Sequence, residues 1–100
     1  MNNIIIAGAG VFGTALAERL AGNPQNRVTL YTIEPDVLED INLRHQNSKY
    51  FPGRHIRKEI IAVDDIACAY QADYLFLVIP SKVIEGFSRL LLGKLKENCL

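Results

Sequence analysis

The sequence predicts an α/β fold built around a doubly wound parallel sheet. Short apolar runs alternate with helical segments along the 100 residues, and right-handed crossovers between such runs make a parallel sheet. A glycine-rich turn, Gly8–Gly13, also lies directly between the first apolar run and the first helical segment. The length suits one compact domain, residues 1–100, and is too short for two.

The first three elements follow from local patterns. Asn3–Ala7 is apolar at consecutive positions, as in a parallel strand that is buried on both faces. Phe12–Ala21 has apolar residues at a spacing of four, which predicts a helix, and the Gly22–Pro24 segment ends it. Arg27–Ile33 is rich in β-branched and aromatic residues and is predicted to form the second strand.

The next segment is predicted from its turn residues. Pro35 suits the first turn of a helix, which continues to about His45. The acidic residues Asp36 and Glu39 lie near the positive end of that helix, where they favour it. Residues 46–57 contain a proline and a glycine and are predicted to be irregular.

The last part of the chain returns to alternating elements. A third strand covers about Ile60–Val63, and Asp64 is predicted to cap a short helix over residues 65–71. Tyr74–Ile79 is the most continuous apolar run and predicts a central parallel strand. A last helix is expected over Val83–Lys96, so the predicted sheet is truncated after its fourth strand and following helix.

A doubly wound sheet binds ligands at the carboxyl ends of its strands. Three loops are therefore expected to meet in space: residues 8–13, residues 32–35, and residues 80–83, where Pro80 ends a strand and Ser81 caps a helix. This edge of the sheet is the predicted ligand crevice.

The first of these loops carries a specific motif. Gly8, Gly10 and Gly13 form G-x-G-x-x-G between a strand and a helix. The first glycine permits the tight turn, the second lets a pyrophosphate approach the backbone, and the third lets the helix pack close to the strand. The helix start offers free N–H groups to the phosphates. The motif in this setting predicts a Rossmann-type dinucleotide site.

The end of the second strand is expected to read the ribose of the dinucleotide. An acidic side chain there holds the 2′-hydroxyl of NAD, and a basic one accommodates the 2′-phosphate of NADP. Thr32 or Ile33 is predicted at the reading position, and no arginine lies there. Glu34 follows directly. Its carboxylate could either contact the ribose or be solvated in the loop. The pattern favours NAD, with NADP as the alternative.

The composition argues against a nucleic-acid binder, a membrane-spanning protein and a metal-binding protein. The 11 basic and 11 acidic side chains cancel, whereas nucleic-acid binders usually carry a basic excess, so no nucleic-acid partner is expected. No apolar stretch is long enough for a membrane span, and neither the two cysteines nor the histidines have metal-ligand spacing. A cytoplasmic protein without a bound metal is expected. A basic group, Lys49, Arg54, Arg57 and Lys58, could attract a phosphorylated ligand or simply be solvated.

Three segments together resemble one enzyme family. Residues 8–17 read GAGVFGTALA, similar to G-x-G-x-W-G-T-A-L-A. Residues 47–53 read NSKYFPG, similar to N-x-x-Y-L-P-G, and residues 78–81 read VIPS, similar to V-P-S. In this order and spacing they are similar to the N-terminal part of the soluble NAD(P)-dependent glycerol-3-phosphate dehydrogenases. The family often has Trp where Phe12 stands, and an arginine is common in its bacterial members where Ile33 stands.

The resemblance implies roles for particular residues. It assigns cofactor binding to residues of the glycine-rich loop and the crevice: Gly8, Ala9, Gly10, Val11, Phe12, Gly13, Ile33, Tyr50, Pro80 and Val83. No catalytic residue is assigned, because the family's lysines lie beyond Leu100. The chain thus looks like an N-terminal fragment that lacks the substrate domain and is inactive alone.

The implied activity is hydride transfer between a nicotinamide cofactor and dihydroxyacetone phosphate or glycerol 3-phosphate. The expected partners are the dinucleotide, a small phosphorylated substrate in the full-length protein, and a second copy of the chain in a homodimer. Two alternatives are a stand-alone Rossmann domain that senses nucleotides and the N-terminal domain of another dehydrogenase, such as a ketopantoate reductase. The 47–53 segment argues against both, since neither needs it.

Overall fold

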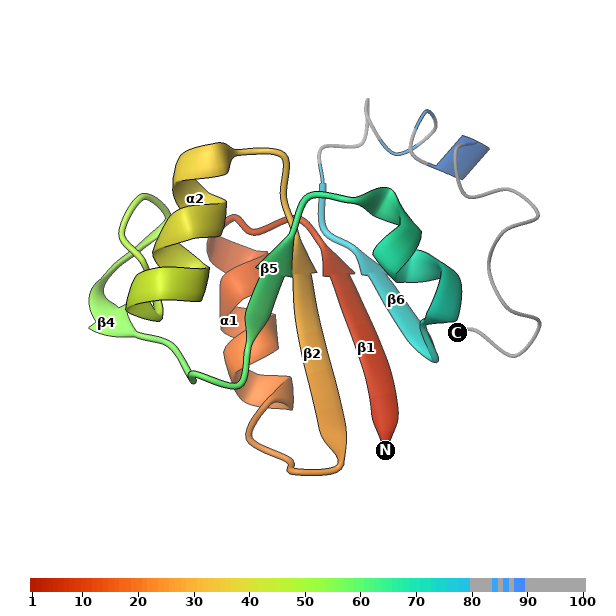
Figure 1. The fold of residues 1–100 in the computed structure, drawn as a ribbon, viewed down its shortest axis with the longest axis horizontal. Coiled ribbons are helices and arrows are strands. Elements are labelled where there is room, and N and C mark those ends of the chain that lie inside the picture. Colours follow the sequence, from red (N-terminus) through yellow and green to blue (C-terminus); the bar gives the residue numbers. More distant parts are fainter. Residues whose placement is uncertain (80–83, 85, 87, 90–100) are drawn as a thin grey trace.

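The computed structural model describes residues 1–79, 84, 86, 88 and 89 and contains the predicted parallel sheet. Its strand order is β5-β2-β1-β6, and all three pairings are parallel (Figure 1). The four strands are β1 (Asn2–Ala7), β2 (Asn26–Tyr31), β5 (Ile61–Val63) and β6 (Tyr74–Leu77). This arrangement confirms the α/β fold class.

Helices cover both faces of the sheet. Helix α1 (Val11–Leu20) and helix α2 (Pro35–Glu39) contribute to one hydrophobic core, and the 3-10 helix η2 (Ile66–Gln71) contributes to the other. Helix α2 continues as a π-helical segment, η1 (Asp40–Arg44), and ends at His45, whose backbone is left-handed at φ 54°. The predicted helix from Pro35 to about His45 is therefore present, with a wider second half.

The position of β1 between two hydrophobic cores explains why its sequence is apolar at consecutive positions. Ile4 and Ile6 pack in the core beneath α1 and α2, whereas Ile5 and Ala7 pack in the core beneath η2. All four side chains are almost completely buried. A strand covered on both faces needs no polar alternation, so the apolar run identified it correctly.

The prediction for residues 46–57 was wrong, because they contain an antiparallel hairpin. Strand β3 (Gln46–Asn47) pairs with β4 (Phe51–His55) through a short turn. Gly53, at φ 79°, lies inside β4, and β3 has only two residues, so neither strand has a recognisable pattern in the sequence. The hairpin lies beside α2 and η1 in Figure 1.

Two smaller expectations also changed. The cap of η2 is Asp65 rather than Asp64, because the Asp65 carboxylate accepts a hydrogen bond from the Ala67 N–H at 2.9 Å. Strand β6 is the outer strand of the described sheet rather than a central one. The predicted last helix over Val83–Lys96 falls largely outside the described residues. Within the described residues, no helix has the length and apolar character to cross a membrane.

Candidate functional site

Two of the three predicted loops meet at the carboxyl ends of β1 and β2. Ala7 and Tyr31 are paired at the ends of these neighbouring strands, and the Gly8 N–H donates to the Tyr31 carbonyl at 3.0 Å. The glycine-rich loop therefore starts beside the 32–34 segment (Figure 1). The third loop, including Pro80 and Val83, lies outside the described residues.

The three motif glycines have different surroundings. Gly8 has φ 125°, and a Cβ there would lie 2.4 Å from the Val78 carbonyl oxygen. A Cβ on Gly13 would lie 1.9 Å from the Gly8 carbonyl oxygen, so α1 approaches the turn too closely for any side chain. A Cβ on Gly10, by contrast, would meet no atom of the described residues within 4 Å. The first and third glycines serve packing, and the second faces open space.

The start of α1 lies at this open space. Gly10 is the residue that precedes the helix, its backbone is extended, and no side chain caps the helix there. The first-turn N–H groups of a helix have no partner within the helix, and they attract anions. Val11 and Phe12 are exposed beside the opening, Phe12 at 64%, whereas Ala9 is buried. The loop is thus suited to receive a phosphate group flanked by an exposed aromatic ring.

Asn47 fixes the loop from the hairpin side. Its side chain is completely buried, and its amide nitrogen donates to the Ala9 carbonyl at 2.8 Å and to Thr14 Oγ1 at 2.9 Å. Its Oδ1 accepts from the Tyr50 N–H at 3.3 Å. Sequence reasoning gave Asn47 no role of its own. The Asn47 amide therefore joins the hairpin to the glycine-rich loop.

The end of β2 presents one carboxylate. Thr32 is buried, and its hydroxyl accepts a hydrogen bond from the Glu34 N–H at 3.2 Å, so it faces away from a ligand. Ile33 is 76% exposed and carries no polar group. Glu34 comes next, and its carboxylate is held by two residues of the hairpin turn rather than by solvent alone.

The two partners of Glu34 come from the same turn. The Tyr50 hydroxyl lies 2.9 Å from both carboxylate oxygens, and the Lys49 ammonium forms an ion pair with Oε1. The hydrogen bond from Lys49, followed by that from Tyr50, lowers the pKa of Glu34. The same carboxylate raises the pKa of Lys49 and that of Tyr50. Glu34 is thus a fixed anion at the strand end.

The basic residues around the hairpin do not form one cluster, because three of them contact different partners. Arg57 binds Glu18 through its backbone N–H at 2.9 Å and its guanidinium at 3.6 Å. Arg54 lies over the Phe51 ring, and Lys49 faces Glu34. Residues of α1 and of the hairpin line a groove of about 470 Å³. It is lined by Phe12, Ala15, Leu16, Glu18, Arg19, Phe51, Arg54 and Arg57.

The described part of the chain contains no set of side chains suited to bind a metal ion. No group of three or more His, Cys, Asp or Glu side chains there could hold a metal ion. The polar groups that do gather at the carboxyl edge are N–H donors, the carboxylates of Glu34 and Asp36, one ammonium and one phenol.

Comparison with known proteins gives one consistent match. A family model described as NAD-dependent glycerol-3-phosphate dehydrogenase N-terminus matches residues 3–100. A relative named glycerol-3-phosphate dehydrogenase, NAD(P)+, from Parvibaculum lavamentivorans is 35% identical over 95% of this chain and 28% of its own length. A relative of the same name from Mesoplasma florum is 43% identical over 83% of this chain and 25% of its length.

Solved structures agree with the sequence comparison. A glycerol-3-phosphate dehydrogenase from Saccharomyces cerevisiae superposes with a TM-score of 0.87 at 25% identity, covering 98% of this chain and 31% of that one. The chain therefore spans less than a third of the length of each of these relatives.

Proposed function

The chain belongs to the NAD-dependent glycerol-3-phosphate dehydrogenase N-terminal family, and on this premise we propose that it is the dinucleotide-binding part of such an enzyme. The predicted site residues of the glycine-rich loop, together with Ile33 and Tyr50, would hold the cofactor. Membership of this family favours the dehydrogenase over a stand-alone sensor or a ketopantoate reductase domain.

The open space at Gly10 is the observation that supports this proposal most. Gly8 and Gly13 are required by close packing, but no contact among the described residues requires a glycine at position 10. A missing side chain beside an uncapped helix start is what a pyrophosphate needs, because its oxygens approach the backbone N–H groups directly.

The cofactor and the protein would have different roles in the reaction. A bound nicotinamide dinucleotide supplies the hydride chemistry, and the protein supplies binding and orientation. In this proposal the glycine-rich loop binds the pyrophosphate and Glu34 accepts a hydrogen bond from the adenosine ribose. A carboxylate at that position disfavours a 2′-phosphate, so we expect NAD to be preferred to NADP. The phosphorylated three-carbon substrate and the catalytic groups belong to the longer protein.

The proposal is tested by titrating the 15N-labelled chain with NAD+ and following its backbone amides by NMR. We expect the amides of Gly8, Gly10 and Gly13 to shift in a saturable way. In Gly10→Val the new side chain occupies the phosphate's approach, so the shifts should vanish while the spectrum stays that of a folded protein. Ala15→Val adds a branched side chain to an exposed position of α1 and serves as the control. Equal binding by Gly10→Val and the wild type would contradict the proposal.

We also propose that the protein works in the cytoplasm as a homodimer. A relative from Drosophila ezoana is named as a cytoplasmic glycerol-3-phosphate dehydrogenase. Strand β6 is the outer strand of the described sheet, and Tyr74 and Phe76 on it are 37% and 36% exposed. Pairing through such an edge would join two copies. Sedimentation that stays monomeric as concentration rises would argue against the dimer.

A further inference from the structure

Resting on the proposed function, we propose that Lys49 and Glu34 together decide which dinucleotide the site accepts. Glu34 would accept the 2′-hydroxyl of the adenosine ribose in NAD. When NADP binds, the Lys49 ammonium would move away from Glu34 and pair with the 2′-phosphate instead. The site would therefore admit both cofactors. The pair, rather than either residue alone, is the specificity determinant.

The position of the pair supports this role. Glu34 follows the carboxyl end of β2, where a doubly wound fold reads the ribose. Thr32 faces inward and Ile33 offers no polar group, so neither can distinguish a hydroxyl from a phosphate. Lys49 reaches the same point from the hairpin, 15 residues away in sequence. It supplies a cation at the carboxyl end of β2, where residues 32–34 include no basic side chain.

The chemistry of the two partners is suited to exchange. Their side chains are 49% and 34% exposed, and an ion pair at such exposure contributes little to stability. The Lys49 ammonium can therefore turn from Glu34 to a phosphate at small cost, because its stem is flexible and its three donors rotate. A phosphate dianion attracts the ammonium more strongly than a carboxylate does.

Tyr50 keeps the carboxylate in place during this exchange. Its hydroxyl lies 2.9 Å from both oxygens of Glu34, so the carboxylate keeps a partner when Lys49 leaves. Asp36 adds a second acid, 3.9 Å from the Lys49 nitrogen. Two acids against one base leave the region negative, which explains why NAD is expected to bind better although NADP is still accepted.

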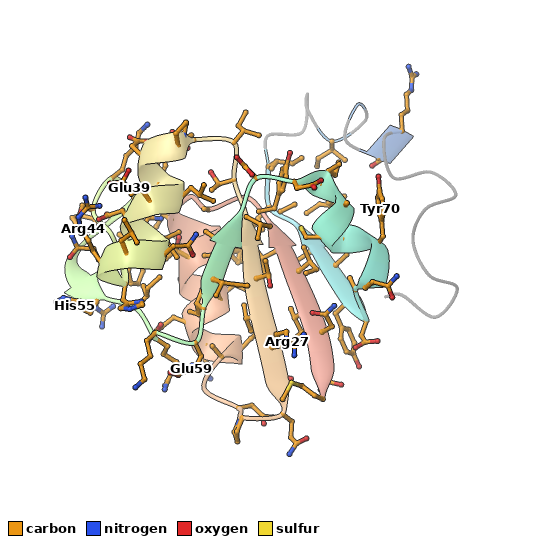
Figure 2. All side chains as sticks on the ribbon, in the orientation of Figure 1. Arg27, Glu39, Arg44, His55, Glu59 and Tyr70 are labelled. Carbon is orange, nitrogen blue, oxygen red and sulfur yellow. The ribbon has the colours of Figure 1, made fainter. Side chains whose placement is uncertain are left out.

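The turn that carries Lys49 is also attached by hydrogen bonds to the glycine-rich loop. Asn47 binds Ala9 and Thr14, and its Oδ1 receives the Tyr50 N–H. A dinucleotide seated on the glycine-rich loop would therefore meet Lys49 and Glu34 at a fixed distance. Two basic residues of the described chain, Arg27 and Lys58, lie far from this turn. In Figure 2, Arg27 and Glu59 mark the amino end of the sheet, and Lys58 precedes Glu59 directly.

The test compares the dissociation constants of NAD+ and NADP+, which differ only in the 2′-phosphate, by amide NMR titration. In Lys49→Met we expect NADP+ to bind about tenfold more weakly, as the loss of one charged contact implies, with NAD+ changed by less than about threefold. In Glu34→Gln we expect NADP+ to bind about tenfold more tightly and NAD+ a few-fold more weakly, which reverses the preference. Lys58→Met removes the same charge at the far end of the sheet and should leave the ratio unchanged.

Each outcome separates this inference from the function on which it rests. If neither dinucleotide moves the glycine amides of the wild type, the proposed function fails. If both bind but Lys49→Met leaves the NAD+ to NADP+ ratio as it was, only the role of Lys49 fails. A loss in Lys58→Met as large as in Lys49→Met would also overturn the inference, since it would reflect net charge alone. An unchanged ratio in Glu34→Gln would exclude the carboxylate as the discriminator.

Discussion

Gly10 and Gly13 belong to one loop, yet a side chain at each would meet different surroundings. At Gly13 a methyl group would lie 1.9 Å from a backbone carbonyl that cannot move without shifting β1 or α1. We expect Gly13→Ala to cost about 3 kcal/mol or more, at the upper end of what overpacking costs. Gly10→Ala should stay within about 0.5 kcal/mol of the wild type, as at an open position. Urea denaturation of both variants measures the contrast, and similar midpoints would refute it.

Asn47 is the polar residue whose loss should matter most to the loop. Its buried amide is joined to Ala9 and Thr14, so Asn47→Ala leaves the Ala9 carbonyl with only the weaker Thr14 hydroxyl at 3.3 Å. Losing the hydrogen bonds of the buried Asn47 amide costs roughly 2 kcal/mol in total. Asn23→Ala is the matched control, because Asn23 makes its hydrogen bond to Gln25 in an exposed turn. Chemical denaturation should show a loss for Asn47→Ala only; equal losses would show that burial is not the cause.

At this scale the glycines were predictable and the polar contacts were not. The spacing of Gly8, Gly10 and Gly13 identifies the loop, because Gly8 and Gly13 meet a local steric need and Gly10 leaves the helix start open. The Asn47 contact with Ala9 joins residues 38 apart, and the Lys49 contact with Glu34 joins residues 15 apart. No local pattern encodes such pairs, since only the folded chain brings them together.

The hairpin formed by β3 and β4 is the element that depends most on carboxylates. Besides the contact of Glu34 with Lys49, the Asp40 carboxylate accepts from the Ser48 N–H at 2.9 Å, and this backbone hydrogen bond lowers the pKa of Asp40. Arg44, at the end of η1, also forms an exposed ion pair with Glu39, the last residue of α2 (Figure 2). The hairpin turn is thus attached to the rest of the fold by ionised groups.

We therefore expect acid to detach the hairpin turn before the sheet unfolds. Both folded pKa values lie below the unfolded ones, so these contacts stabilise fully above about pH 4.5, and the stabilisation is lost as pH falls through the folded values. Between pH 5 and about pH 3, hydrogen exchange at Ser48 and Tyr50 should accelerate more than exchange in β1, after correction for intrinsic rates. In Asp40→Asn the Ser48 amide should already exchange faster at pH 7. A uniform acceleration across the chain would contradict this.

The elements that the sequence predicted share one property. Strands β1 and β2 are short runs with side chains in the hydrophobic cores, and their burial leaves a clear apolar signal. Strand β5 is apolar along its length but buries only Ala62. The hairpin strands are mostly exposed and include Pro52 and Gly53, so their pairing depends on Asn47 and Asp40 rather than on apolar patterning. The cap of η2 was missed by one residue because Asp64 and Asp65 have the same chemistry.

The molecule as a whole is expected to bind a cofactor without turning it over. Hydride transfer requires a substrate within near-attack distance of the nicotinamide, and a displacement of about 1 Å costs on the order of 100-fold in rate. The chain covers 28% of its Parvibaculum relative, so most of that relative's length has no counterpart here. Purified chain with NADH and dihydroxyacetone phosphate should show no loss of NADH absorbance beyond a protein-free control. Measurable turnover would reveal catalytic groups within these residues.

The contacts of Asn47 and Tyr50 constrain how the gene can change. The two residues lie three positions apart, one attached to the glycine-rich loop and the other to Glu34, and the Tyr50 N–H closes the turn onto Asn47. Ser48 and Lys49 between them can be exchanged for other residues without breaking either attachment. One inserted codon there would displace one of the two anchors, whereas an insertion in the exposed turn at residues 23–25 would displace neither. The fold of the turn should therefore tolerate substitutions of Ser48 and Lys49 but reject any change in length.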